Sequence, residues 1–372
     1  MAGAVVHGLI VGKFYPPHAG HHRLIDTAAR ACDEVTVVVA PSTVESIPLA
    51  DRLAWLREVH AASPHVRFVG VYDDLPIDYG SAEAWEGHCA LFRAAAGERD
   101  VDLVFSSEAY GEELARRFGA RHVPVDPDRG VMPVSGTAVR ADPVANWAYL
   151  APPVRAWFTR RVVVVGAEST GTTTLARALA AHLRLRRGAF GGTTWVEEYG
   201  RTLTSLKMAD LAPGEGVADL VWTRADFVTV AREQNAAEDA AARSGGPILL
   251  CDTDSFATAI WEERYLGSAS QAVRDAARRP ALYLLTSHEG VPFEDDGMRD
   301  GEHLRAWMTG RFRAELAACG VPWIELTGPY RDRLARAVRA CDELLARGWD
   351  LASPLLPADA SIDAGRIVGG DC

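Results

Sequence analysis

The chain has 372 residues, 48% of them hydrophobic and 24% charged, which is ordinary for a globular protein with room for two cores. Its 39 basic and 50 acidic residues give a net charge of −11, which argues against non-specific binding to nucleic acid or anionic membranes. The six cysteines form no C-x-x-C pair, and neither a signal-peptide pattern nor a membrane-spanning apolar run is present. We therefore expect a two-domain cytoplasmic protein with free thiols.

Strand-like and helix-like segments alternate through residues 1–150, which we interpret as the first domain. The alternation predicts a parallel sheet with helices on both faces, a doubly wound, Rossmann-like α/β fold. Such sheets bind ligands at the carboxyl ends of their strands. Strands are predicted at residues 5–11, 35–40, 66–71, 101–105 and 121–125, and helices at residues 23–31, 49–62, 82–96 and 110–118.

A proline- and aromatic-rich connector at residues 141–160 separates this domain from a stretch in which the alternation restarts. The renewed alternation therefore predicts a second doubly wound α/β domain over residues 160–348. Residues 349–372 are rich in Pro, Ala, Asp and Gly, and we expect a loosely ordered tail. The strands expected in the second domain are residues 161–165, 194–196, 247–251, 282–285 and 322–326, with a long helix at about 219–242.

The loop after the first strand carries two histidines in a glycine- and proline-rich setting. Gly12 lets the chain turn sharply, and His18 and His21, three apart at a helix start, share one face. A helix N-terminus attracts phosphate, and two imidazoles with Lys13 add donors that stabilise charge on a phosphoryl group. A pair of surface histidines in a turn is the alternative interpretation.

Residues 12–21 fit the pattern Gly-x-Phe-x-Pro-x-His-x-Gly-His, which includes Phe14. The pattern resembles the nucleotidyltransferase signature of the adenylyltransferase and cytidylyltransferase superfamily. Residues 134–140 resemble its second signature, Ile-Ser-x-Thr-x-x-Arg, with valine for isoleucine. There, Ser135 and Thr137 can cap a helix and donate to phosphate, and Arg140 can clamp a phosphate with two parallel hydrogen bonds.

This resemblance implies that a phosphate of a second substrate attacks the α-phosphate of a nucleoside triphosphate and that pyrophosphate leaves. Catalysis of that kind depends on positioning and charge stabilisation rather than on a covalent nucleophile. The groups expected to supply it are Lys13, His18, His21 and Arg140. Mg²⁺ is expected to shield the triphosphate.

Residues 162–174 have the layout of a P-loop, a buried strand followed by a glycine-bracketed loop and a helix. The usual lysine is replaced by Thr172, whereas Thr173 can still bind Mg²⁺. Asp252 and Asp254 follow a hydrophobic run and would face the same side of a regular strand. They could meet one Mg²⁺ or polarise a hydroxyl, and a polar turn is the alternative.

A nucleotidyltransferase domain followed by a P-loop NTPase-like kinase domain is similar to the NadR-type bifunctional family. Members combine nicotinamide-mononucleotide adenylyltransferase with ribosylnicotinamide kinase. Over about residues 5–345 the resemblance implies ATP, nicotinamide mononucleotide, ribosylnicotinamide and NAD as ligands. By this resemblance Ser107 lies beside the adenosine, Gly166, Glu168, Ser169, Gly171, Thr172, Thr173, Thr174 and the lid residue Arg299 surround ATP, and Glu198, Tyr199 and Arg201 lie near the nucleoside.

Several of these residues have structural alternatives. Glu198 and Arg201 could form a surface ion pair, and Arg299 could belong to a solvated charged loop. Trp85 follows the third strand and could stack on a nicotinamide ring, although core packing is the better explanation.

Threonine at position 172 lacks the charge with which a P-loop lysine neutralises the β- and γ-phosphates. The second domain could be a kinase with a replacement cation such as Arg299, a regulatory nucleotide-binding domain or a relic. We expect the kinase, because the acidic pair and the lid are intact.

Two alternatives apply to the whole chain. The first is nucleotidyl transfer to another phosphate acceptor such as phosphopantetheine, and the second is a nucleotide sensor with little catalysis. A first strand at about residue 5 and a net charge of −11 disfavour DNA binding. The sequence leaves open a homo-oligomer, the preference for amidated or deamidated substrates and the exchange of intermediate between sites.

Overall fold

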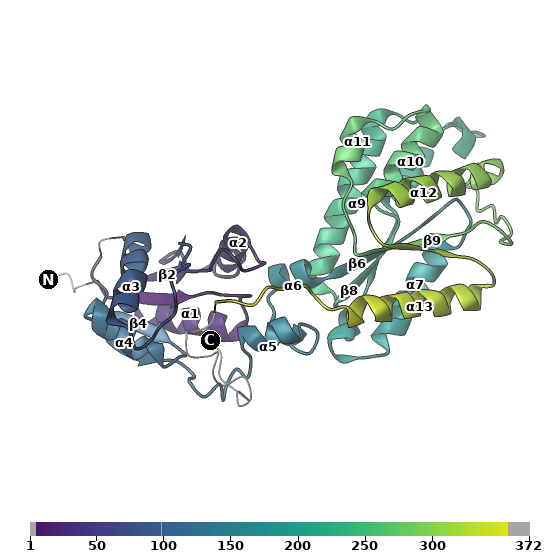
Figure 1. Ribbon diagram of the computed structural model, residues 1–372. Helices are drawn as coiled ribbons and strands as arrows, with labels where there is room; N and C mark the ends of the chain where they lie inside the picture. Colours follow the sequence, from purple (N-terminus) through teal and green to yellow (C-terminus); the bar gives the residue numbers. More distant parts are fainter. Residues whose placement is uncertain (1–4, 98, 356–372) are drawn as a thin grey trace. The chain divides into compact units, whose positions relative to one another are not determined.

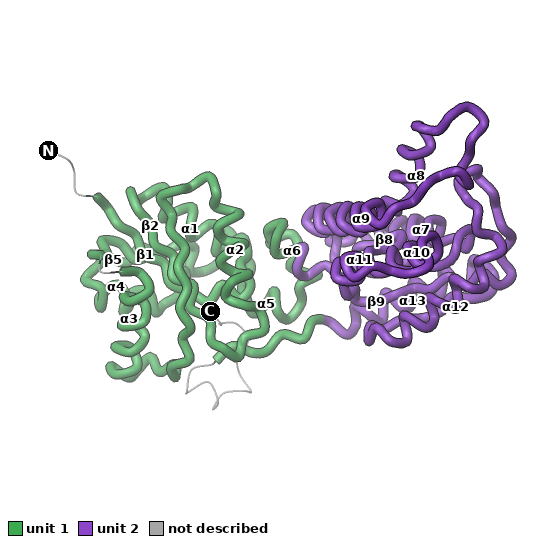
Figure 2. Tube along the Cα trace, turned by 90° about the horizontal axis from the view of Figure 1, so that it is seen from above, with its two compact units in different colours: residues 1–154, 349–372 green, residues 155–348 purple. Residues whose placement is uncertain are grey.

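A computed structural model describes residues 5–97 and 99–355, and the chain divides into two compact units (Figures 1 and 2). The first unit runs to Val154 and resumes at Trp349, and the second comprises Arg155–Gly348. The chain therefore returns to the first unit after completing the second. Among the described residues, no helix is both long and apolar enough to cross a membrane.

The first unit is built on a five-stranded, fully parallel sheet with the order β3-β2-β1-β4-β5. Strand β2, with the sequence EVTVVV, is rich in valine, as expected of a strand that is buried on both faces. Leu9 faces one core and Ile10 the other, as the alternation of a strand requires. The strands are β1 (His7–Gly12), β2 (Glu34–Val39), β3 (Val66–Gly70), β4 (Leu103–Ser106) and β5 (Arg121–Pro124). The helices are α1 (Ala19–Ala31), α2 (Leu49–Val59), α3 (Ala82–Ala96), α4 (Tyr110–Phe118), α5 (Gly136–Ala141) and α6 (Pro152–Phe158), with a 3₁₀ turn at Trp147–Tyr149.

The second unit contains another five-stranded parallel sheet, ordered β10-β9-β6-β8-β7. Its central strand β6 alternates, with Val162 packing in one core and Val163 in the other. The strands are β6 (Arg160–Gly166), β7 (Trp195–Val196), β8 (Ile248–Asp252), β9 (Leu282–Thr286) and β10 (Trp323–Leu326). The helices are α7 (Thr172–Arg184), α8 (Tyr199–Ala209), α9 (Arg224–Ser244), α10 (Ser255–Leu266), α11 (Gln271–Ala276), α12 (Arg305–Cys319) and α13 (Tyr330–Ala346), with 3₁₀ turns at Gly188–Gly192, Val217–Asp219 and Glu302–Leu304.

Two doubly wound α/β sheets confirm the predicted fold class. The long helix predicted from about residue 219 begins later, at Arg224, because Thr223 and Asp226 form a reciprocal capping box. Within the predicted tail, residues 349–355 belong to the first unit, whereas residues 356–372 lie outside the described part of the chain.

Candidate active sites

A cavity of about 520 Å³ opens in the first unit beside the ends of β1 and β4. The strand order reverses between these two neighbours, which is where doubly wound sheets bind ligands. The structure brings together here all ten residues predicted for the first site. They are Gly12, Lys13, Phe14, His18, His21, Trp85, Ser107, Ser135, Thr137 and Arg140.

The two motif histidines cap α1. His18 is the N-cap, and its Nδ1 accepts a hydrogen bond from the Gly20 amide at 3.2 Å, while the His18 amide donates to Nδ1 of His21 at 3.3 Å. Because Nδ1 is the acceptor in both rings, the proton of each neutral imidazole resides on Nε2. The ring centroids lie 3.8 Å apart, so both rings present Nε2–H donors from one corner of the cavity.

Both imidazoles are held neutral. Burial, followed by nearby His22 and the guanidinium groups of Arg129 and Arg140, lowers the pKa of His18 from 6.5 to about 3. Burial also lowers the pKa of His21 well below its usual value, with His18 as the next cause. These rings are suited to donate hydrogen bonds to a phosphoryl group rather than to carry a positive charge.

Arg140 joins the second motif to the first. Its Nη1 donates to the Tyr15 carbonyl at 2.7 Å, its Nη2 donates to Thr137 Oγ1 at 3.0 Å, and its guanidinium lies 4.8 Å from the Tyr15 ring centroid. A Cβ at Gly136 would lie 2.9 Å from the Tyr15 carbonyl oxygen, so only glycine allows this approach. The Ser135 hydroxyl caps α5 by accepting from the Ala138 amide at 3.0 Å.

Lys13 is positioned by a buried ion pair that the sequence interpretation missed. Its Nζ lies 3.1 Å from Glu45 Oε1, while the other oxygen of Glu45 accepts from Arg52 Nη1 at 2.6 Å. Arg52 is fully buried, also donates to the Lys13 carbonyl at 2.7 Å and stacks over Tyr15. The Glu45–Arg52 pair therefore fixes the motif loop in two ways: Glu45 holds the Lys13 side chain, and Arg52 holds the Lys13 backbone carbonyl.

Other lining residues were also missed. Arg129 forms an ion pair with Glu108 at 2.7 Å, and both line the cavity. His88 pairs with Asp73 at 2.6 Å, and that hydrogen bond raises the pKa of His88 against the opposing effect of burial. Trp85 is 8% exposed, lies in a core cluster and donates from its indole to the Tyr79 carbonyl, so it serves mainly the core.

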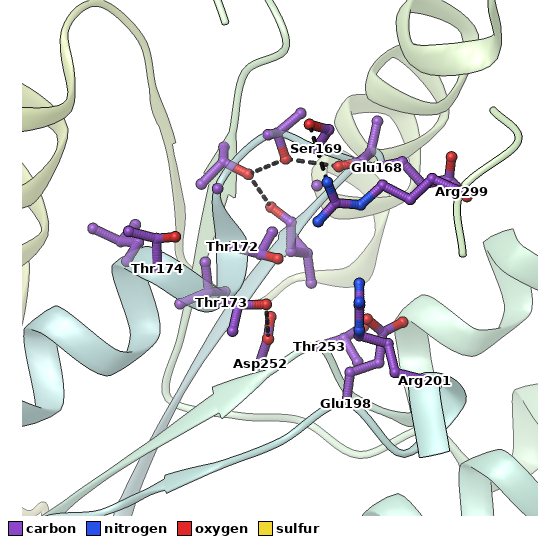
Figure 3. A pocket seen from close by; sticks show the side chains of 18 of the residues that line it. Glu168, Ser169, Thr172, Thr173, Thr174, Glu198, Arg201, Asp252, Thr253 and Arg299 are labelled. Carbon is purple, nitrogen blue, oxygen red and sulfur yellow. Dashed lines mark hydrogen bonds between the residues drawn. The ribbon is translucent and has the colours of Figure 1, made fainter. Parts of the chain in front are cut away.

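The second unit holds a cavity of about 410 Å³ around the P-loop (Figure 3). Gly166 is required there because a Cβ would lie 2.2 Å from Thr286 Oγ1. Gly171, at φ 87°, begins α7 in the left-handed conformation that favours glycine. Of the residues predicted for this site, those lining the cavity are Gly166, Glu168, Ser169, Gly171, Thr172, Thr173, Thr174, Glu198, Arg201, Asp252 and Arg299.

Thr173 and Asp252 meet at the start of α7, where the Thr173 hydroxyl donates to Asp252 Oδ2 (Figure 3). Asp252 is 2% exposed, and burial raises its pKa, while the hydroxyls of Thr173 and Thr172 favour its charged form. Thr172 therefore helps to stabilise the charged form of Asp252. Among the described residues, Asp252 Oδ1 is buried without a hydrogen-bond donor, so the carboxylate has room for a cation ligand.

The structure places Asp254 apart from the cavity that Asp252 lines, which differs from the predicted pairing of the two carboxylates. Thr253 has φ 66°, which breaks the strand alternation, so Asp254 does not line the cavity. Its carboxylate caps α10 through the Ala257 amide at 2.9 Å and accepts from the Tyr283 hydroxyl at 2.7 Å. Burial raises the pKa of Asp254 to about 6, and its role is structural.

Glu198 is another carboxyl that lines this cavity. Burial and the nearby Asp252 raise its pKa, against the opposing effect of Arg201. Tyr199 is not among the residues that line the cavity, and its backbone amide donates to Gln234 Oε1 at 3.0 Å.

The loop around residues 294–301 is tied to the P-loop. Ser169 Oγ accepts from the Glu294 amide at 2.8 Å, and Glu168 accepts from the Gly301 amide at 2.8 Å. Glu168 also forms a nearly buried ion pair with Arg264 at 2.6 Å. These contacts commit Glu168 to holding the loop rather than to binding phosphate, and Figure 3 shows Arg299 beside Ser169.

The second cavity also has a lining that motif reasoning did not find. Trp222, Phe227 and Tyr265 form a cluster with ring centroids 5.3 to 6.1 Å apart, suited to an aromatic base. Arg333 is 4% exposed and donates to the Gly328 and Ser287 carbonyls. These residues lie far from the P-loop in the sequence, so the P-loop motif gave no indication that they line the same cavity.

Comparisons with known proteins find relatives of both domains. Residues 9–141 match the family described as cytidylyltransferase-like, and residues 161–333 match the family described as AAA domain. The trifunctional NAD biosynthesis/regulator protein NadR of Salmonella typhimurium is 27% identical over 309 residues, 78% of this chain and 71% of the relative. The protein of the same name from Escherichia coli is 28% identical over 312 residues, with the same shares covered.

Two solved structures of NadR protein, one in complex with NR and one with NAD and AMP-PNP, each have a TM-score of 0.67 to this chain. They are 22% and 20% identical to it, and the likeness covers 94% of this chain and 98% and 99% of theirs. At that identity the likeness shows the fold, with both domains in the same order.

Proposed function

We propose that this NadR-type chain, a nucleotidyltransferase domain followed by a P-loop domain, makes NAD from nicotinamide mononucleotide and ATP at its first site. The second site would phosphorylate ribosylnicotinamide to that mononucleotide. The observation that carries the proposal is the capping geometry of His18 and His21, which occupies both Nδ1 atoms and leaves the Nε2–H groups as donors on two rings that line the same cavity as Lys13.

At the first site, a phosphate oxygen of the mononucleotide attacks the α-phosphorus of ATP, and the bond to the bridging oxygen of pyrophosphate breaks. Negative charge builds on the α-phosphoryl oxygens, where His18 and His21 donate hydrogen bonds. Lys13 supplies a fixed charge that Glu45 and Arg52 hold in place. Arg140 ties both motifs to the Tyr15 carbonyl and so keeps these donors in register.

At the second site, the nucleoside hydroxyl attacks the γ-phosphorus of ATP and ADP leaves. The hydroxyl proton needs an acceptor, and Glu198 lies in the cavity with a raised pKa, as a general base should. The aromatic cluster of Trp222, Phe227 and Tyr265 would stack on the nicotinamide ring. Arg299 would replace the charge of the missing P-loop lysine.

Mg²⁺ fits the second site on the chemistry of its donors. The Thr173 hydroxyl and the Asp252 carboxylate, with one oxygen unsatisfied, are oxygen ligands of the kind that Mg²⁺ takes alongside phosphates and waters. Within the described part of the chain, no cluster of three His, Cys, Asp or Glu side chains offers an all-protein metal site. When bound, the ion would neutralise the β- and γ-phosphates.

The test is incubation with Mg-ATP and either nicotinamide mononucleotide or ribosylnicotinamide, with NAD and ADP measured separately. His21→Ala should abolish NAD formation and leave ADP formation from the nucleoside unchanged. Exposed His182 on α7 provides the matched control, and His182→Ala should leave both reactions intact. Failure of the unaltered protein to form NAD from the mononucleotide would refute the first assignment, and ADP formation that depends on His21 would refute the separation of sites.

A further inference from the structure

The chain returns from α13 to the cavity of the first unit. We name Leu351–Leu355 the C-terminal strap. The Ala352 amide donates to Ser46 Oγ at 2.7 Å, and the Ala352 carbonyl accepts from the Tyr15 hydroxyl at 2.8 Å. The Leu355 carbonyl accepts from Lys13 Nζ at 3.4 Å. Ser353, Pro354 and Leu355 line the cavity, so this segment docks directly on the first motif.

The groups that bind the strap, Tyr15 and Lys13, also line the cavity in which we expect phosphate to bind. The guanidinium groups of Arg52 and Arg140 both lie over the Tyr15 ring, and the Tyr15 hydroxyl also accepts from the Ser46 amide at 3.1 Å. A carbonyl of the strap therefore fixes a ring that both arginines contact. Lys13 has three N–H donors, and with Glu45 on one side and Leu355 on the other its ammonium is held from two directions.

The strap walls the cavity without filling it. With the strap in place, about 520 Å³ remains, within the range of cavities that hold small-molecule ligands. An inhibitory plug would instead occupy the corner between His18 and Arg140, and both of these side chains still line open space.

We propose that the C-terminal strap is a built part of the nucleotidyl-transfer site, positioning Lys13 and Tyr15 and closing one wall around the substrates. This inference rests on the proposed function of that site. The strap follows the P-loop domain in the chain, so residues 1–150 alone lack one wall of their own active site. Its residues act through Lys13 and Tyr15 and are positioning residues.

The test compares two truncations of the full chain. A chain ending at Asp350 lacks the strap, and a chain ending at Ala358 keeps it with the Leu355 carbonyl still part of a peptide bond. We expect the shorter chain to lose about tenfold or more in kcat/KM for adenylyl transfer, the change that one or two lost hydrogen bonds produce. The loss should fall mainly on KM for one of the two substrates, because His18 and His21 keep their capping bonds. The longer chain should stay within about twofold of the full protein.

A point-variant pair tests the same docking without truncation. Ser46→Ala removes the acceptor of the Ala352 amide, whereas Ser46→Thr keeps a hydroxyl there. We expect KM to rise with alanine and to return toward the original value with threonine, with the thermal unfolding midpoint unchanged in both. A merely structural strap would lower the unfolding midpoint and leave KM unmoved, and that result would overturn the inference.

Three further outcomes also overturn it. A gain in activity on removing the strap would identify an inhibitory segment, equal activity in both truncations would show that the strap contributes nothing, and equal losses would place the effect beyond Ala358. If the full-length chain forms no NAD from the mononucleotide, the proposed function itself fails, and that result is distinct from all three.

Discussion

The neutrality of His18 gives a prediction that can be measured through stability. Burial lowers its pKa from 6.5 to about 3 in the folded chain, whereas the unfolded chain has the ordinary value. Below pH 6.5 the His18 imidazole therefore binds a proton in the unfolded state but not in the folded state. As a result, the free energy of unfolding falls as the pH falls. A pH of 5 lies about 1.5 units below the pKa of the unfolded imidazole. At 1.36 kcal/mol per unit, this lowers the free energy of unfolding by about 2 kcal/mol.

The measurement compares the unaltered protein with His18→Asn, since asparagine also caps helices but does not titrate. Urea unfolding at pH 8 and pH 5 gives the loss of unfolding free energy for each protein, and other titrating groups are common to both. We expect the unaltered protein to lose about 2 kcal/mol more than the variant. Equal losses would mean that His18 is not held neutral, and the assignment of its Nε2–H as a phosphate donor would fall with it.

Four further changes test the two sites. Arg140→Lys should lower kcat/KM for adenylyl transfer by about tenfold or more, because an ammonium cannot reach the Tyr15 carbonyl and Thr137 together; steady-state kinetics measures this. Gly136→Ala should lower both NAD formation and the unfolding midpoint, since its Cβ would lie 2.9 Å from the Tyr15 carbonyl oxygen, and full activity would contradict the close approach. Thr172→Lys should raise nucleoside phosphorylation by about tenfold or more if Arg299 only partly replaces the missing charge, measured as ADP release. Phosphorylation should increase toward alkaline pH, because the raised pKa of Glu198 keeps this base protonated at low pH, and Glu198→Gln should abolish both the rate and its pH dependence.

The features that could be predicted from the sequence are those set by residues close to one another along the chain. Both doubly wound sheets follow from alternating strand and helix patterns, and His18 and His21 were found because three-residue spacing at a helix start places them together. The position of Asp254 differs from the predicted one because Thr253, at φ 66°, interrupts the strand alternation after β8. Neither composition nor spacing indicates a left-handed threonine.

The residues that support the first site could not be found in the same way. Arg52 reaches the motif loop from 39 positions away, and Leu355 reaches Lys13 from 342 positions away. These contacts depend on how β2, α2 and the returning chain fold onto β1. Their side chains carry no motif of their own, so only the assembled structure shows what holds Lys13.

The two cavities differ in where their positive charges come from. Three cations, Lys13, Arg129 and Arg140, line the first cavity together with its histidines. At the second site Glu198 and Asp252 lie on the rigid sheet edge, while Arg299 lies on the loop that Ser169 and Glu168 hold. Arg201 of α8 and Arg333 of α13 also line this cavity, but Arg201 pairs with Asp296 of the same loop and Arg333 donates to backbone carbonyls. Phosphorylation at this site should therefore depend on loop placement to a degree that a P-loop lysine normally makes unnecessary.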